Sequence, residues 1–424
     1  ISQVDLNDPA DIWTIDGSLH TLSDRPGMDS QKTNSYGMKV FHSFDGFELQ
    51  SYTSSTDTNV IFSYDADWGN TDSHFPYVYD YFSETLRDRK SFNQEFRAVS
   101  DSADFQKNSF FEWVIGANYL ELKESNLKKD DGLYGDPSDP YGPYASASAS
   151  SSKYKSSNFS VFGNLDYLLS ASLKFSIGLR WEDWEADYAD SLQESFNPTD
   201  KMSGGKISLI KNMTNGTNMY ASLAKGYKQG GFNLGLGLDA NSRNKNLAYD
   251  PEFLTNYELG INTKLLDSKI TFNGVLFYSD REDQQVLIST QTDPSDPNTF
   301  SFLTQNAAEG VNHGLEINMD MDINQSLSAF VNLGILKTEI KNWQSRQDLD
   351  GRAQAHAPER SYALGLNWAP TSHTYLAIDF TGKSSFYYSD SHNNKSKSYV
   401  LTNLNLGYVK NNWNYELWAR NIFD

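Results

Sequence analysis

The stretch that decides the fold runs from 219 to 286 and begins MYASLAKGYKQGGFN (219–233). After a polar segment ending at Pro251, it continues as EFLTNYELGINTKLLDSKITFNGVLFYSDREDQQV (252–286). Two long strand-like runs are joined there by a short turn, Leu266 to Ile270, and each end opens into a polar loop rich in Asn, Asp and Gly. A short turn between two such runs predicts an antiparallel pair of strands. The same pattern recurs along the chain.

Apolar and polar side chains alternate within the strand-like runs. In ASLKFSIGLRW (171–181), Leu173, Phe175, Ile177, Leu179 and Trp181 share one face, and the residues between them are Ser, Lys, Gly and Arg. A period of two with one apolar and one polar face indicates a β-strand. The alternation returns in 256–265, 315–321, 327–335 and 403–408, with Phe330 as an exception that places a ring on the polar face.

The connections between these runs alternate between short and long. Short ones such as 265–269 and 322–326 are followed by long ones such as 63–90, 125–153 and 231–251. Bacterial outer-membrane barrels have short periplasmic turns and long extracellular loops. The predicted fold class is therefore all-β, a transmembrane antiparallel up-and-down β-barrel with the apolar face in lipid. About sixteen strands are expected, near 34–43, 46–62, 91–100, 110–124, 154–168, 171–188, 201–212, 217–230, 252–265, 269–288, 302–322, 326–340, 359–369, 374–388, 398–409 and 412–423.

Composition excludes several classes of function. The 424 residues contain 38% hydrophobic and 14% aromatic side chains, and no run of about 18 apolar residues that would form a transmembrane helix. With 35 Lys and Arg against 55 Asp and Glu, the net charge of -20 argues against nucleic-acid binding, which needs a basic surface. There is no cysteine, the seven histidines are scattered, and no catalytic triad can be assembled. We therefore expect no metal site, no cofactor and no enzyme activity.

Several segments resemble the barrel of TonB-dependent outer-membrane receptors. Order and spacing agree along nearly the whole chain. The segments are FNQEFRAVS (92–100), WVIGANYLE (113–121), SVFGNLDY (160–167), LKFSIGLRWE (173–182), YASLAKGYKQGGFN (220–233), PEFLTNYELGINTK (251–264), FYSDREDQQV (277–286), NAAEGVNHGLEI (306–317), HAPERSYALGLNW (356–368) and WNYELWARNIFD (413–424).

The resemblance implies a multi-pass barrel in the bacterial outer membrane that actively takes up a scarce solute, most often a ferric siderophore. It also implies a TonB complex as partner, engaged through an N-terminal plug domain, and contact with lipid and lipopolysaccharide. Residues 1–424 show no plug motif, and about sixteen of an expected twenty-two strands, so we expect a single incomplete barrel domain. Uptake of a glycan fragment, cobalamin or another nutrient stays open, as do a passive porin and a soluble or adhesive β protein.

The expected barrel assigns places to the candidate site residues. Aromatic side chains in the outer loops are the candidate ligand contacts, because flat rings grip a bulky ligand at little entropic cost. These are Tyr141, Tyr144, Trp343, Tyr387 and Tyr388, the last two of which also suit an interfacial girdle. Charged residues on the polar face are expected to line the lumen in ladders, namely Glu95, Arg97, Arg180, Glu258, Lys264, Glu316, Glu416 and Arg420.

Other polar motifs have a structural interpretation beside the functional one. The pentapeptide DPSDP occurs at 136–140 and 293–297, where a turn is favoured over a calcium site. The acidic group Glu182, Asp183, Glu185 and Asp187 suits a solvated rim better than a site for divalent ions that bridge lipopolysaccharide. Glu282 and Asp283 beside Arg281 suit a salt-bridged rim better than a catalytic pair, and His313 and His356 are expected to be structural.

Overall fold

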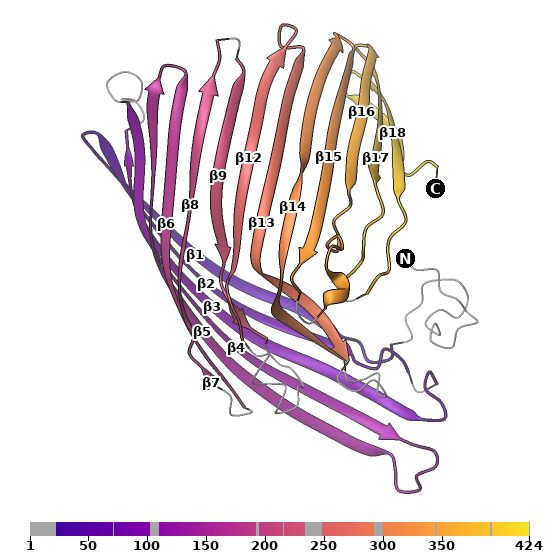
Figure 1. The fold of residues 1–424 in the computed structure, drawn as a ribbon. Helices are drawn as coiled ribbons and strands as arrows, with labels where there is room; N and C mark the ends of the chain where they lie inside the picture. The colour runs from indigo at the N-terminus through magenta and orange to yellow at the C-terminus, as the bar shows by residue number, and fades with distance from the viewer. Residues whose placement is uncertain are drawn as a thin grey trace.

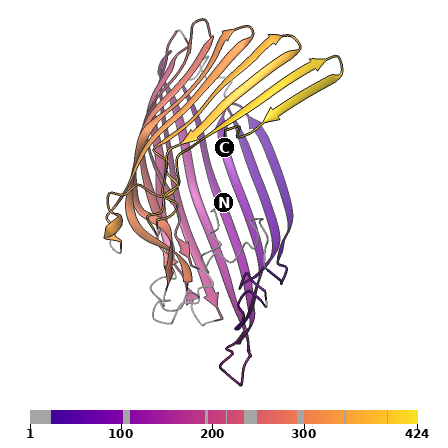
Figure 2. The ribbon, with the colours of Figure 1, turned by 90° about the vertical axis from the view of Figure 1, so that its right-hand side faces the viewer.

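The protein is one curved antiparallel sheet with a tiny second sheet at its outer end. The structure, a computed structural model, describes residues 23–70, 72–101, 110–191, 195–214, 216–233, 248–291, 300–343, 346–390 and 392–423. No helix in these ranges is long and apolar enough to cross a membrane. Figures 1 and 2 show tilted strands side by side in a single curved wall.

Each long strand pairs with its neighbours in chain order, apart from the short insertions β7, β10 and β11. This confirms the up-and-down prediction, and the described residues form the sixteen long strands that were expected. The first half of the wall comprises β1 (Met28–Phe44), β2 (Phe47–Asp65), β3 (Val78–Ser100), β4 (Phe111–Gly135), β5 (Tyr144–Ser170), β6 (Leu173–Asp190), β7 (Ser195–Phe196), β8 (Thr199–Asn212) and β9 (Asn218–Lys228). The second half comprises β12 (Glu252–Leu265), β13 (Ile270–Gln291), β14 (Phe300–Asn324), β15 (Leu327–Lys341), β16 (Arg360–Thr371), β17 (Thr374–Lys383), β18 (Tyr399–Lys410) and β19 (Trp413–Ala419).

Besides β7, three short elements of the described residues lie in the long connections at the outer end. β10 (Gly231–Phe232) and β11 (Ala248–Tyr249) form a two-stranded antiparallel sheet after β9. A 3-10 turn, η2 (Gln347–Leu349), lies between β15 and β16. These elements place the outer connections against the wall, where the candidate site lies.

The apolar face of the wall is exposed, as a membrane-facing surface requires. Leu179 is 64% and Leu259 60% exposed, whereas Arg180, next to Leu179, faces the other way and pairs with Glu182. We call the exposed apolar face the outward face and the opposite, polar face the inward face. Such a surface can lie in lipid because the backbone N–H and C=O groups of each strand are hydrogen-bonded to the neighbouring strands.

Two rows of outward aromatic rings bound the apolar belt. Tyr119 is directly opposite Phe159, and eight residues away along the same strands Phe111 is opposite Tyr167. All four rings are 37–47% exposed. Eight residues span about 27 Å along a strand, or roughly 20 Å along the membrane normal at a tilt of about 40°, which is close to the ~25 Å band of outer-membrane barrels. The rows mark the two membrane interfaces.

β3, β4 and β5 run far beyond the belt, where the sequence predicted long loops. The predicted loops 63–90 and 125–153 are wrong in extent, because the connections are 66–77 and 136–143 and the rest is strand. β5 alone has 27 residues. Outside the membrane both faces of a strand meet water, so the alternation that signals a strand fades although the backbone ladder continues.

Phe330, the exception to the alternation, packs its ring across a glycine on the neighbouring strand. Phe330 is directly opposite Gly365, and a Cβ atom at Gly365 would collide with the Phe330 ring. The inward face therefore accepts this aromatic ring because the opposite residue has no side chain.

Candidate ligand-binding face

An aromatic cluster covers part of the inward face above the membrane belt. Trp184 and Tyr188 of β6 are 1% and 3% exposed. Phe232 of β10 stacks on Tyr188 with ring centroids 5.3 Å apart and meets the edge of Tyr154 at 5.7 Å. We call these four residues and Phe196, whose ring is 6.4 Å from that of Phe232, the inner aromatic cluster. The cluster fixes the segment after β9 against the wall.

Polar side chains hold the base of the same segment. Glu252 receives the guanidinium of Arg281 (Nε to Oε1, 2.9 Å) and the backbone N–H of Gln285 (2.9 Å). The amide of Asn233 exchanges two hydrogen bonds of 2.7 Å with the backbone of Thr304. A register shift in β13 after Arg281 brings these groups together. The base of the segment is thus fixed at several points.

Two arginines share one carboxylate on the inward face of β3 and β4. The Glu124 side chain is 6% exposed, and Arg89 Nε donates to it at 2.6 Å. Arg87 Nε lies 3.6 Å from the same carboxylate and donates to Asn126 at 2.9 Å. The Arg87 and Arg89 side chains remain 42% and 49% exposed. This Arg87–Glu124–Arg89 group carries one net positive charge and has donors free to face a ligand.

The eight charged residues predicted to line the lumen interact locally. Glu95 and Arg97, two apart on β3, form an ion pair, and Arg180 pairs with Glu182 at 2.7 Å. In the described part of the chain, Glu95 with Arg97 is the one ion pair that joins two of the eight. Two of the other carboxylates accept hydrogen bonds from asparagines: Glu258 from Asn256 (2.7 Å) and Glu416 from Asn405 (2.6 Å). The Arg420 guanidinium lies 5.1 Å from the centroid of the Trp418 ring, and Lys264 is exposed. The lumenal place of Glu316 stays a prediction.

The five predicted ligand-contact rings have different surroundings. Tyr141 is 84% and Tyr144 51% exposed, and the Tyr144 hydroxyl donates to Asp139 at 2.8 Å. Tyr388 is 50% exposed. Trp343 is 1% exposed and packs with Val286, Ile340 and Leu349, so in this structure its ring is a packing element, closed to a ligand.

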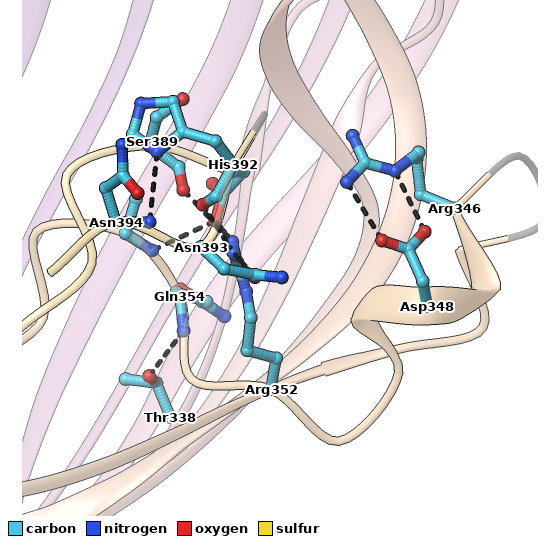
Figure 3. A network of polar contacts seen from close by, with 11 residues as sticks. Thr338, Arg346, Asp348, Arg352, Gln354, Ser389, His392, Asn393 and Asn394 are labelled. Atoms are coloured by element: carbon cyan, nitrogen blue, oxygen red, sulfur yellow. Dashed lines mark hydrogen bonds and ion pairs between the residues drawn. The ribbon is translucent and has the colours of Figure 1, made fainter.

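Tyr387 belongs to an interlocked pair of outer loops, 342–359 and 384–398. Arg352, whose side chain is 8% exposed, reaches from the first loop into the second (Figure 3). Its guanidinium donates to Asp390 at 2.8 Å and to the carbonyls of His392 (2.9 Å) and Ser389 (3.2 Å), and lies 4.3 Å from the centroid of Tyr387. We call this set of contacts the Arg352 clasp. Because Tyr387 is held in it, its ring supports the loops.

The acidic group of β6 does not converge on one site. Glu182 is 5% exposed, faces inward, and accepts from Asn158 (2.9 Å) and Tyr227 (3.1 Å) as well as Arg180. The prediction that it belongs to a solvated rim is therefore wrong. Asp183, Glu185 and Asp187 lie on the opposite face, because successive side chains of a strand alternate. The same alternation, continued from Arg180, would have placed Trp184 and Tyr188 inward.

The remaining predicted motifs serve as turns and packing elements. At 136–140, Asp136 accepts from the backbone N–H of Ser138 (2.8 Å), as an Asx turn does, while 293–297 lies outside the described residues. Arg281 forms its ion pair with Glu252, so the prediction that it pairs with Glu282 and Asp283 in a rim is wrong. His313 stacks on Tyr278 at 6.1 Å and the His356 backbone donates to the Tyr387 carbonyl. No group of three potential metal ligands occurs in the described ranges.

Two buried carboxylates, those of Asp65 and Asp67, accept hydrogen bonds at the start of the outer loop 66–77. Burial would raise the pKa of Asp65, but hydrogen bonds from Ser23 (2.7 Å) and from backbone N–H groups hold its pKa below the ordinary value. Burial, together with the charge of Asp65, raises the pKa of Asp67 above the ordinary value, although Tyr81 and Gly69 donate to it. The two shifts have opposite signs.

We expect this loop to be most stable between the two pKa values. The stability that Asp65 contributes is lost as the pH falls through its lowered pKa, and that of Asp67 is lost as the pH rises through its raised pKa. Limited proteolysis of 66–77 against pH measures this directly. Asp67→Asn is expected to abolish the loss on the alkaline side alone; an unchanged profile in this variant would contradict the assignment.

The chain is similar to known proteins along its whole length. Residues 3–422 match the family described as "TonB dependent receptor-like, beta-barrel". Similar solved structures include the ferric yersiniabactin uptake receptor FyuA from Yersinia pestis (TM-score 0.67, 16% identity, 93% of this chain and 56% of that chain). A second is the siderophore receptor PiuA from Acinetobacter baumannii (TM-score 0.65, 16% identity, 91% of this chain and 59% of that chain). A third is the copper transporter OprC (TM-score 0.69, 14% identity, 95% of this chain and 61% of that chain). The chain thus spans less than two thirds of the length of these proteins.

Proposed function

Because this chain belongs to the TonB-dependent receptor β-barrel family, whose members are bacterial outer-membrane proteins, we propose that it forms the wall of a receptor that actively imports a scarce solute. The proposed solute is a ferric siderophore, and the proposed energy source is the TonB complex, engaged through a plug domain. FyuA and PiuA, with the same fold, are a ferric yersiniabactin uptake receptor and a siderophore receptor.

The observation that supports an anionic solute is the Arg87–Glu124–Arg89 group. Two half-exposed guanidinium groups share a single buried carboxylate on the inward face, so their remaining N–H donors are available for the oxygen atoms of a ferric chelate. Exposed rings in the outer loops, Tyr141 and Tyr388 among them, suit the first contact with a bulky ligand. A neutral glycan fragment has no negative charge to pair with these two guanidinium groups, so it would bind them less strongly than a ferric chelate.

Transport by the full-length protein tests this proposal. Deleting the gene is expected to abolish uptake of a labelled ferric siderophore, and removing TonB is expected to do the same. Normal iron uptake in the deletion strain, with growth lost on a glycan instead, would favour another nutrient. Swelling of liposomes containing the full-length protein in small sugars would favour a passive porin.

Arg89→Gln is expected to weaken binding of the ferric siderophore. Losing a charge-assisted hydrogen bond costs about 1.5–3 kcal/mol, which is roughly a 10- to 100-fold rise in Kd. Glu124 keeps Arg87 as its partner, so the fold is expected to persist. Lys129→Gln is the matched control, because Lys129 pairs with Glu84 on the outward side of the same two strands. Equal losses of affinity in both variants would rule out a specific contact with Arg89.

A further inference from the structure

The β4–β5 hairpin extends beyond the neighbouring strands at the outer end of the wall (Figure 1). β5 pairs with β4 from Tyr144 onward, but its pairing with β6 begins only at Ser152. Ser151 also has a partner on that side, because it exchanges hydrogen bonds of 2.8 and 3.0 Å with Ser191. Among the described residues, none pairs with the β6 side of residues 144–150. We call this side of 144–150 the free edge of β5.

The unpaired backbone groups of the free edge belong to three alanines. In an antiparallel strand the N–H and C=O of one residue point to the same side, and the side alternates from residue to residue. Those of Ser151 point toward β6, so those of Ala145, Ala147 and Ala149 do as well. The free edge thus offers three donors and three acceptors, repeated about every 6.8 Å. This spacing matches the backbone of another extended chain.

The free edge lacks the features that prevent another strand from adding. Exposed edges of natural sheets commonly carry lysine, proline or a β-bulge. The segment YASASASS (144–151) contains no charged residue and no proline, and it pairs with β4 in unbroken register. Its alanine and serine side chains are small, so another backbone can approach closely from the side.

The opposite edge of the same extension is covered by the chain itself. Tyr81, near the outer end of β3, donates its N–H to the Asp67 carboxylate at 2.6 Å, and its carbonyl accepts from the N–H of Ala66 at 2.7 Å. Arg25 reaches across to Asp131 of β4 at 2.8 Å. In the described part of the chain, the extension of β3 to β5 therefore has one edge satisfied and one edge open.

A second copy of the protein in the same membrane does not fit the free edge. Such copies are related by rotation about the membrane normal, so β5 runs toward the membrane in each of them. At a tilt of about 40°, strands related by a two-fold axis along the normal cross at roughly 80°, which is too steep for a hydrogen-bonded ladder. The occupant therefore comes from outside the membrane.

We propose that an extended segment of another polypeptide adds to the free edge of β5 as an antiparallel strand. Its backbone hydrogen bonds supply the affinity, as in other cases of strand addition. Directly opposite residues share a face of the sheet, and hydroxyl side chains hydrogen-bond across strands. The segment therefore alternates apolar residues opposite Ala145, Ala147 and Ala149 with Ser or Thr opposite Ser146 and Ser148. This contact is separate from solute binding at the Arg87–Glu124–Arg89 group.

Peptide binding to the full-length protein in detergent tests the proposal. The fluorescent probe alternates threonine and valine over seven residues, with one lysine at each end for solubility. Measurements at about 0.5 M salt screen the attraction between these lysines and the acidic protein. The unaltered protein is expected to bind the probe, measured by fluorescence anisotropy. The same peptide with proline at two successive central positions lacks N–H donors on both of its edges, so it is expected not to bind.

Ala147→Pro is expected to raise the Kd of the alternating peptide at least about tenfold. Proline removes one N–H of the free edge and places its ring against the added strand. The N–H of residue 147 takes no part in the ladder with β4, so the hairpin is expected to persist. Ala147→Ser is the matched control, because it keeps the N–H, and its Kd is expected to stay within about twofold of the unaltered protein.

Four outcomes would overturn the proposal. They are no binding of the alternating peptide by the unaltered protein, equal binding of the proline-containing peptide, an unchanged Kd in Ala147→Pro, and an equal loss in Ala147→Ser. If Ala147→Pro loses the hairpin, seen as fast hydrogen exchange of the Lys128 and Asp130 N–H groups, Ser148→Cys decides. These 424 residues contain no cysteine, so a peptide with a central cysteine is expected to form a disulfide with that thiol. Equal disulfide formation by a cysteine peptide that also carries the two prolines would contradict the assignment.

Discussion

Arg352→Ala is expected to release two outer loops at once. Arg352 is largely buried and its guanidinium is paired with Asp390, which is 16% exposed. Removing one partner of a buried ion pair leaves the other charge uncompensated, at a cost of about 3–5 kcal/mol. Because Asp390 keeps some contact with water, we expect about 3 kcal/mol.

Backbone hydrogen exchange in both loops measures this loss. The N–H groups of His356, Tyr388 and Ser396 donate to carbonyls within or between the two loops. Their exchange is expected to accelerate about 100-fold, because 1.4 kcal/mol corresponds to a factor of ten.

Arg346→Ala is the matched control for the Arg352 clasp. Arg346 lies in the same loop and pairs with Asp348 at 2.9 Å, but the two side chains are 32% and 58% exposed (Figure 3). An exposed pair contributes about 0–1 kcal/mol, so the expected change in exchange is less than about fivefold. If the two variants accelerated exchange equally, the Arg352 clasp would not be what joins the loops.

Trp184→Ala is expected to lower the free energy of unfolding by about 3–5 kcal/mol. Trp184 is 1% exposed and packs with Ala186, Met202 and the rings of the inner aromatic cluster. Truncating a fully buried large side chain loses its transfer free energy and leaves a cavity. Urea unfolding of the full-length protein in detergent, followed at several concentrations, gives the difference.

Trp181→Ala is the matched control for Trp184→Ala, because it also removes an indole ring, but one that is not buried. Trp181 lies three residues before Trp184 on β6, faces outward, and is 38% exposed. Its loss is expected to cost roughly 1 kcal/mol, since exposed positions contribute much less than buried ones. A larger effect at Trp181 than at Trp184 would show that the inward side of β6 does not bury its rings as described.

Most of the wall could be predicted from the sequence because the signal for a membrane strand is local. Alternation within runs such as 171–181 is produced by lipid on one face and polar surroundings on the other. The same signal failed outside the membrane, in the outer parts of β3 to β5, where both faces meet water. The same signal also predicted that the strand continues to 388, although β17 ends at Lys383. Tyr387 instead contacts Arg352, and the Tyr388 N–H donates to the Asn394 carbonyl in the same loop.

The candidate site was harder to predict because its contacts join distant residues. Arg352 and Asp390 are 38 residues apart, and Asn233 and Thr304 are 71 apart. No periodicity in the chain connects such pairs. Trp343 illustrates the consequence, since an aromatic residue in an outer loop suits a ligand contact until the fold buries it against Leu349.

By itself, the sequence determined the strands, their order, the face of each that meets lipid, and the family. The period of two and the turn lengths are properties of neighbouring residues, so they can be read without the fold. The tertiary structure alone decided which side chains meet across strands and loops: the Arg87–Glu124–Arg89 group, the Arg352 clasp and the inner aromatic cluster. Those meetings depend on register and loop closure, which fix distances between residues that the chain keeps far apart.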